Sequence, residues 1–158
     1  MGADEDSQGA DASLDDVARF IAAQPLAVVS TLGPDGRPQS ALVGIALSDR
    51  FELVFDSVIS SRKVRNLRRD PRVSVVIGGT MADERTVQLD GVADEPDGAE
   101  GDRIRDAYFA RWPEGRERLQ WAGLTHVRVT AHWIRWSDYI APAIIEWTRP
   151  DKGELRRS

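Results

Sequence analysis

Short runs of alternating apolar and polar residues, separated by tight-turn signals, occupy most of this chain. Residues 26–32 and 38–47 are two such runs on either side of Gly33-Pro34-Asp35-Gly36, a sequence typical of a hairpin turn. The other runs of this kind are residues 51–55, 73–77, 85–92 and 124–136. Side chains alternate between the two faces of a strand, so each run predicts a strand with one buried face. Six strands joined mostly by short turns predict an antiparallel barrel with peripheral helices.

Helical spacing interrupts the strand pattern near the N-terminus and again after residue 102. Ser13 is followed by Asp15, Asp16 and a set of apolar residues three and four apart, which predicts a capped helix as far as Ala23. Residues 103–111 have the same spacing until Pro113, and residues 114–121 predict a further short helix. The acidic, glycine-rich residues 93–101 predict a loop.

The length of 158 residues suits one domain with its own core. We expect that domain to span residues 13–148, after a disordered lead at residues 1–12 and before a loose tail at residues 149–158. No apolar run approaches the roughly 20 residues that a membrane helix needs, and the first residues lack the pattern of a secretory signal. These features predict a cytoplasmic protein without membrane contact. The absence of cysteine excludes disulfides, thiolate metal sites and a cysteine nucleophile.

Hydroxyls and cations are concentrated in the sequence Ser60-Ser61-Arg62-Lys63, shortly after the run at residues 51–55. Either serine can cap a helix there, and the first turn of a helix leaves backbone N–H groups without intrahelical partners. These N–H groups and the two cations together favour a bound anion such as a phosphate. The alternative is a capped surface helix with a solvated basic face.

Six cations lie between residues 62 and 72, which raises nucleic-acid binding as a function. The net charge of −5 and the lack of interleaved aromatic residues argue against nucleic acid as a partner. His126 and His132 are the two histidines, and no third ligand accompanies them. We therefore expect no metal site.

The segment FDSVISSRKVRNLRRDPRVSVVI, followed by ERTVQLDGVAD and AYFARWP, resembles the flavin-binding split-barrel family whose namesake is pyridoxamine 5′-phosphate oxidase. The similarity extends from about residue 27 to residue 139. It implies a mainly β fold with peripheral α-helices, namely a six-stranded antiparallel Greek-key split barrel of the FMN-binding type. It also implies a homodimer with flavin mononucleotide (FMN) in two clefts at the subunit interface, where each chain supplies half of a site.

The resemblance assigns cofactor contacts to several parts of the chain. The strand that borders the isoalloxazine ring corresponds to Ser40, Ala41, Leu42 and Val43, and the ribityl side corresponds to Phe55, Asp56 and Ser57. The phosphate-binding residues correspond to Ser61, Arg62 and Lys63. Arg85 and Thr86 would reach the cofactor from the partner subunit. Trp136 falls near an aromatic position that lies against the flavin, with simple barrel packing as the alternative.

Several departures separate this chain from the namesake oxidase. Ala41 and Ala46 stand where the oxidase has an arginine and a lysine, and Thr86 replaces the usual glutamine. No Arg-x-His segment, which serves the pyridoxal ring, follows Trp147. We therefore expect an FMN-dependent oxidoreductase that acts on another small reducible substrate, with no catalytic residue assigned. Two alternatives stay open: a deazaflavin-dependent reductase of the same fold, and a non-catalytic split barrel that binds flavin or another ligand.

Overall fold

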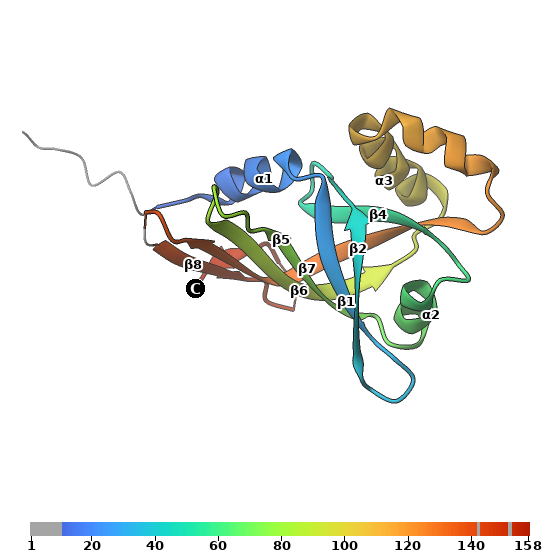
Figure 1. The fold of residues 1–158 in the computed structure, drawn as a ribbon, viewed down its shortest axis with the longest axis horizontal. Helices are drawn as coiled ribbons and strands as arrows, with labels where there is room; N and C mark the ends of the chain where they lie inside the picture. Colours follow the sequence, from blue (N-terminus) through green and yellow to red (C-terminus); the bar gives the residue numbers. More distant parts are fainter. Residues whose placement is uncertain (1–10, 142, 152) are drawn as a thin grey trace, which may run out of the picture.

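A nine-stranded antiparallel sheet dominates the computed structural model, which describes residues 11–141, 143–151 and 153–158 (Figure 1). The predicted disordered lead lies outside the described residues except for Asp11 and Ala12. The strands are β1 (Leu26–Leu32), β2 (Pro38–Gly44), β3 (Ala46–Leu47), β4 (Glu52–Val58), β5 (Arg72–Gly78), β6 (Arg85–Asp94), β7 (Leu124–Asp138), β8 (Ala143–Thr148) and β9 (Arg156–Arg157). Each of the six predicted runs forms strand structure.

The sheet closes on itself into a barrel. Its strands are hydrogen-bonded in the order β2-β1-β5-β6-β7-β4-β3, and β3 follows β2 after the single residue Ile45. β2 and β3 therefore act as one interrupted strand that belongs to both ends of this order. The resulting ring confirms the predicted mainly β, antiparallel split-barrel class. The predicted total of six strands is wrong, because β2 and β3 are separate and because β8 and β9 extend the sheet beyond the ring.

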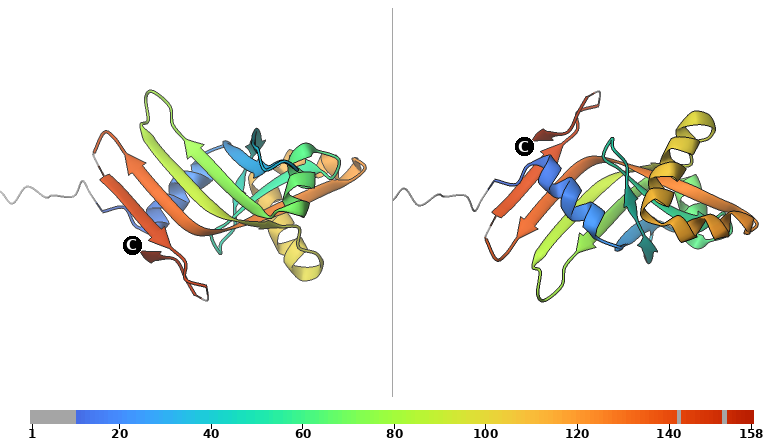
Figure 2. Two further views of the ribbon diagram at one scale, coloured as in Figure 1. Left: turned by 90° about the horizontal axis from the view of Figure 1, so that it is seen from below. Right: turned by 90° about the horizontal axis from the view of Figure 1, so that it is seen from above.

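The barrel splits along β7. Residues 124–130 of β7 pair with β4, whereas residues 133–138 pair with β8. A β-bulge lies between the two halves, where Asp90 pairs with Trp133 and Gly91 pairs with Ala131, so His132 is the extra residue. An added Cβ on Gly91 would lie 2.3 Å from the backbone oxygen of Thr130, and glycine thus permits the close approach of the strands. Figure 2 shows β7 leaving the ring and continuing beside β8.

In the part of the chain that the structure describes, three α-helices and one 3-10 helix accompany the sheet, namely α1 (Leu14–Ala23), α2 (Arg62–Arg69), α3 (Gly98–Arg111) and η1 (Pro113–Gln120). The predicted capping box of α1 is confirmed: the Asp16 N–H donates to Ser13 Oγ at 3.2 Å, and the Ser13 N–H donates to the Asp16 carboxylate at 2.7 Å. The loop predicted at residues 93–101 is wrong over most of its length, because β6 continues to Asp94 and α3 begins at Gly98.

Two hydrophobic clusters hold these elements together. Inward-facing strand residues and the buried face of α1 form the main core inside the barrel. Strand β5 illustrates the predicted alternation, since Val73, Val75 and Ile77 are buried and their neighbours are exposed. A smaller cluster lies beneath α3 and includes Ala46, Val54, Ile104, Tyr108 and Phe109. The resulting frame packs α2 against β1 and β6, and a hydrogen bond from Asn66 to Gln39 joins α2 to β2. The candidate site lies there.

The segment after Thr148, for which the sequence predicts a loose tail, contains the two-residue strand β9, and Leu155 packs against the main core. Over the described part of the chain, no helix combines the length and apolar character required to cross a membrane.

Candidate functional site

The N-terminus of α2 is built by the two serines that precede and face it. Of the two serines that the sequence offers as the cap, Ser60 and Ser61, the structure has Ser61 as the N-cap. Ser61 has extended backbone angles, and its Oγ accepts a hydrogen bond from the Val64 N–H at 3.4 Å. The Ser57 Oγ lies 3.0 Å from the Ser61 Oγ, which ties the helix start to β4. The backbone N–H groups of Arg62 and Lys63 lie in the first turn and have no intrahelical acceptor. This end of α2 therefore presents donors and positive charge to a ligand.

Two adjoining cavities border α2. The first, here called the β2 cavity, has a volume of about 260 Å³ and is lined by Thr31, Gln39, Ser40, Ala41, Arg62, Lys63 and Asn66. The second, here called the arginine cavity, has a volume of about 460 Å³ and is lined by Pro34, Gln39, Arg62, Arg65, Asn66 and Arg69. Both cavities share Gln39, Arg62 and Asn66. They form one basic cleft between α2 and the β1–β2 hairpin.

Asn66 fixes the floor of this cleft. Its side chain is 2% exposed, and its amide nitrogen donates to Thr31 Oγ1 at 3.0 Å and to Gln39 Oε1 at 2.8 Å. Its oxygen accepts a hydrogen bond from Arg69 Nη2 at 2.7 Å. A buried side chain whose amide nitrogen and amide oxygen both have hydrogen-bond partners is costly to disturb. Asn66 thereby sets the positions of Gln39 and Arg69 on the two sides of the cleft.

The cations that line the cleft differ from the other cations of the same segment. Arg68 is held by Glu95 at 2.7 Å and Arg72 is held by Asp70 at 2.6 Å. Within the described residues, Arg62, Lys63 and Arg65 make no ion pair, and neither cavity is lined by an aspartate or a glutamate. The chain carries 26 acidic residues against 21 basic ones. A cleft whose charged lining residues, among those described, are all cations is therefore a local exception that favours an anionic ligand.

The strand predicted to border the flavin ring contributes only part of its residues to the cleft. Ser40 and Ala41 line the β2 cavity. Leu42 points away from the barrel and is 63% exposed, whereas Val43 belongs to the main core. Ala46, where the namesake oxidase has a lysine, is buried beneath α3. The missing charge that bears on the cleft is therefore the one at Ala41.

The three residues predicted for the ribityl side separate in the structure. Ser57 lies beside Ser61, but the Phe55 side chain is buried in the core. The Asp56 carboxylate accepts the Tyr108 hydroxyl at 2.9 Å and Arg118 Nε at 2.7 Å, and it thus faces α3 and η1. Burial and the nearby Asp56 charge raise the pKa of Tyr108 to about 12, so this hydroxyl keeps its proton.

The residues expected to act from the partner subunit lie elsewhere in this chain. Arg85 is held by Asp83 at 2.7 Å and lies over the ring of Phe20. Thr86 follows it in β6 and lines neither cavity beside α2. Trp136 is 5% exposed and packs edge-to-face on Phe20, with the ring centroids 5.1 Å apart. Within one chain, barrel packing accounts for Trp136.

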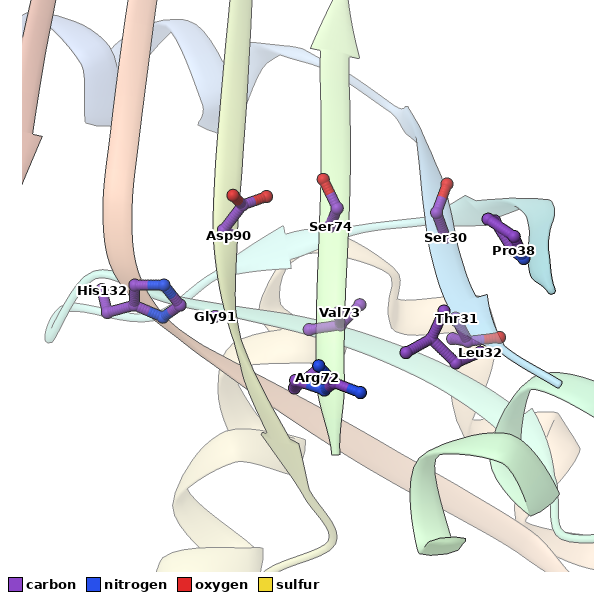
Figure 3. A pocket seen from close by; sticks show the side chains of 10 residues that line it. All are labelled: Ser30, Thr31, Leu32, Pro38, Arg72, Val73, Ser74, Asp90, Gly91 and His132. Carbon is purple, nitrogen blue, oxygen red and sulfur yellow. The ribbon is translucent and has the colours of Figure 1, made fainter. Parts of the chain in front are cut away.

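A shallow groove of about 400 Å³ runs across the outer face of the sheet beside the β2 cavity (Figure 3). In Figure 3, Ser30, Ser74 and Asp90 point outward from adjacent strands. Thr31 lines both the groove and the β2 cavity, and the Ser30 Oγ lies 2.8 Å from the Ser40 Oγ. The groove and the β2 cavity thus adjoin each other at Thr31.

Neither histidine belongs to a metal site in the described residues, because no group of three or more metal-ligating side chains lies close enough together there to hold a metal ion. His126 is 7% exposed, and burial lowers the pKa of its imidazole. Its ring lies against Tyr108 and Phe109, with centroids 5.2 and 5.3 Å away. His132 is exposed at the bulge of β7 and lines the sheet groove.

Sequence reasoning missed Gln39, Asn66, Arg65 and Arg69 as lining residues. Two signals for them are present in the chain. Gln39 and Ala41 lie two apart on one face of a strand. Arg62, Arg65, Asn66 and Arg69 recur at helical spacing on one side of α2.

A family-wide sequence profile described as pyridoxamine 5′-phosphate oxidase matches residues 13–135. The chain belongs to this family. A pyridoxine/pyridoxamine 5′-phosphate oxidase from Rubrobacter xylanophilus is 34% identical over 96 residues, which are 60% of this chain and 42% of that relative. The matched part of the chain thus spans about two-fifths of the relative's length.

Solved structures agree on the fold of this member of the pyridoxamine 5′-phosphate oxidase family. A heme binding protein from Mycobacterium smegmatis has a TM-score of 0.73 at 23% identity, over 94% of this chain and 58% of that one. A pyridoxamine 5′-phosphate oxidase-related, FMN binding protein from Nostoc punctiforme has a TM-score of 0.66 at 16% identity, over 85% of this chain and 86% of that one. At these identities the likeness concerns the fold alone.

Proposed function

We propose that this protein binds FMN in the cleft between α2 and β2 and acts as an FMN-dependent oxidoreductase on a small substrate. One observation carries the proposal: Arg62 and Lys63 line the same cavity as Ser40 and Ala41, and no carboxylate lines it. The cations are thereby directed toward the strand that the family resemblance places beside the flavin ring. An FMN-binding protein shares the fold.

The residues present fit a phosphate. A phosphate monoester carries a charge of about −1.5 to −2 near neutral pH, and Arg62 and Lys63 supply two positive charges. The N–H groups in the first turn of α2 add donors that point along the helix axis. Without a cation at Ala41, the phosphate would rely on the charges of Arg62 and Lys63, which no described carboxylate neutralises.

FMN would supply the redox chemistry when bound, since it exchanges a hydride or single electrons with a substrate. The protein's own part is to hold and orient. Lys63 and Arg62 anchor one end, Asn66 keeps Gln39 in place through a 2.8 Å hydrogen bond, and Ala41 leaves room where a longer side chain would enter the β2 cavity.

The outer face of the sheet supports a homodimer with shared clefts. Val28 pairs with Leu42 on one side and with Val76 on the other, and these three apolar side chains are 39%, 63% and 44% exposed. They form a continuous apolar row on adjacent strands, next to the cleft. Such a row suits burial against a second copy of the chain. Arg85 and Thr86 of that copy would then complete the site.

The deazaflavin-dependent reductase and the non-catalytic binder are the competing functions. Preference for a deazaflavin over FMN would support the first competitor. FMN binding without reduction by a nicotinamide donor or any substrate would support the second. Turnover of pyridoxine phosphate at the rate of the namesake oxidases would contradict our view that the substrate differs.

The test replaces both proposed phosphate cations. Arg62→Ala with Lys63→Ala should weaken FMN binding by about 2–4 kcal/mol if both side chains make charge-assisted contacts. The matched control is Arg19→Ala with Arg68→Ala, which removes two exposed cations that pair with Asp16 and Glu95. Titration of flavin fluorescence gives both affinities. Equal FMN affinity in the two double variants would remove the phosphate assignment.

A further inference from the structure

A further cavity, here called the α3 cavity, lies between α3, η1 and the start of β7. Its volume is about 240 Å³, below the roughly 300–1,000 Å³ of a pocket for a drug-sized ligand. Its lining includes Glu95, Arg105, Leu119, Trp121, Thr125 and His126. None of its lining residues lines the β2 cavity, the arginine cavity or the sheet groove. The α3 cavity is therefore separate from the flavin cleft and suits a smaller molecule.

His126 is a lining residue whose hydrogen bonding is incomplete. The side chain is 7% exposed, and its Nε2 is buried with no hydrogen-bond partner among the described residues. Asp56 pairs with His126 across β4 and β7, but its carboxylate oxygens already accept hydrogen bonds from Tyr108 and Arg118. A buried polar atom without a partner is costly, and a bound molecule would supply that partner.

The imidazole of His126 is suited to donate to an anion. Burial lowers the pKa of His126, and the charges of Arg105 and Arg118 lower it further against the opposite effect of Asp56. The ring is therefore neutral near pH 7 and has one N–H donor. The two guanidinium charges that act on the ring make its surroundings favourable for a negative group.

Arg105 adds further donors to the α3 cavity from the side of α3. Within the described residues its one ion pair is with Asp102, three positions earlier on the helix, and both side chains are substantially exposed. Exposed pairs of this kind contribute little. A guanidinium has five N–H donors, so Arg105 can contact Asp102 and a ligand together.

The acidic residue of the lining is already neutralised. Glu95 accepts hydrogen bonds from Arg68 Nε at 2.7 Å, from Arg68 Nη2 at 2.9 Å and from Thr125 Oγ1 at 2.7 Å. The Arg68 hydrogen bonds lower the pKa of Glu95, so it is ionised and paired. The donors left for a ligand are those of Arg105 and His126.

Two apolar side chains complete the lining of the α3 cavity. Leu119 at the end of η1 and Trp121 just after it are both more than half exposed. The indole of a tryptophan favours contact with another flat ring. The cavity thus combines a polar, donor-rich part with an apolar part.

We infer that the α3 cavity binds a small organic anion, namely a carboxylate on a flat apolar body. The carboxylate accepts hydrogen bonds from His126 and Arg105, and the body packs against Leu119 and Trp121. This site does not depend on FMN, because it shares no lining residue with the flavin cleft.

The experiment titrates benzoate into the whole protein and follows both histidine rings by proton–nitrogen correlation NMR. His132, which is exposed and lies outside the α3 cavity, is the internal control, and His132→Gln assigns the two sets of signals. We expect saturable binding with a dissociation constant of about 1 mM or lower. The signals of His126 should shift to those of a ring with hydrogen on Nε2, and the signals of His132 should stay in place.

Two arginine variants and a neutral ligand test the assignment of the charge. Arg105→Gln should weaken benzoate about tenfold, through the loss of charge-assisted hydrogen bonds. The matched control is Arg111→Gln, on the same helix but outside the lining, and it should change the affinity less than about twofold. Benzamide, which has the same shape without the charge, should bind at least about tenfold more weakly than benzoate.

Three results would overturn the inference. If benzoate leaves the His126 signals unchanged, water is the partner of Nε2 and the site does not exist. If Arg105→Gln and Arg111→Gln bind benzoate equally well, or if benzamide binds as tightly as benzoate, the cavity does not select an anion. If Arg62→Ala with Lys63→Ala abolishes benzoate binding, the ligand occupies the flavin cleft instead. The proposed function is unaffected by the first two results, since FMN binding is measured independently.

Discussion

Replacing Asn66 by aspartate should weaken binding of the flavin's phosphate without weakening binding of its ring. The two side chains have nearly the same shape, and Asn66 lies 2% exposed at the junction of the two cavities. The change adds one negative charge to a cleft that no described carboxylate lines. Arg69, whose Nη2 is 2.7 Å from the Asn66 oxygen, can keep its contact as an ion pair.

The magnitude follows from Coulomb's law and the local hydrogen bonds. Two unit charges about 6 Å apart repel by about 0.7 kcal/mol in water and about 2.8 kcal/mol at an effective dielectric constant of 20. Asn66→Asp should therefore weaken FMN by about 1–3 kcal/mol. Stability should fall by about 1–2 kcal/mol, because the amide donors to Thr31 and Gln39 are lost. The loss is limited because the Thr31 hydroxyl can turn to donate and the Gln39 amide can flip to present its NH2 group.

Riboflavin supplies the internal control because it has the ring and the ribityl chain without the phosphate. In fluorescence titrations, Asn66→Asp should lower the affinity for FMN and leave the affinity for riboflavin unchanged. Gln120→Glu, at the exposed end of η1, controls for the change in net charge. The reasoning is refuted if FMN and riboflavin lose affinity equally, or if FMN affinity is unchanged while urea unfolding shows an intact fold.

Three further changes test the interface, the buried histidine and the bulge. Leu42→Asp places a charge in the exposed apolar row and should raise the dimer dissociation constant at least about tenfold in sedimentation equilibrium; an unchanged constant would exclude this face. Because burial lowers the pKa of His126, the unfolded chain binds a proton below about pH 6.5 that the folded chain excludes. Stability should therefore fall as the pH drops from 6.5 to 5, and His126→Phe should reduce that slope in urea unfolding, whereas equal slopes would contradict the assignment. Gly91→Ala should cost about 1–3 kcal/mol of stability, since its Cβ would meet the Thr130 oxygen at 2.3 Å; a stability equal to wild type would refute the close approach.

Periodicity predicted the barrel because its strands each bury one face. The alternation at residues 73–77 and the capping box at Ser13 are local signals, and both are confirmed. The closure of the ring through Ile45 is a long-range property and has no local signal. The strands β8 and β9 were missed for a related reason: the short β8 is defined by its pairing with β7, and β9 by its pairing with β8.

Glycine misled the prediction at the start of α3. Gly98 and Gly101 disfavour a helix by intrinsic propensity, yet the helix begins there because Gly101 packs closely on Pro96. A Cβ on Gly101 would lie 2.5 Å from the Pro96 carbonyl oxygen. Tertiary contact thus overrides propensity at this position.

The sequence predicted only those parts of the candidate site that depend on local signals. Ser61, Arg62 and Lys63 follow from helix capping and charge, which are local, and the structure places Arg62 and Lys63 in one cavity with Ser40 and Ala41. The side chains of Phe55 and Asp56 point to the core and to α3, because adjacent strand residues face opposite ways. Asn66 could not be predicted, since its role depends on Thr31 and Gln39 from another part of the chain.

The central claim is that the cleft between α2 and β2 holds a flavin by its phosphate. The most direct test is a titration of the purified protein with FMN and with riboflavin, followed by flavin fluorescence and by the visible absorption spectrum. We predict one FMN per chain, bound at least about 100-fold more tightly than riboflavin because only FMN engages Arg62 and Lys63. Equal affinities for the two ligands, or the absence of FMN binding, would contradict the account.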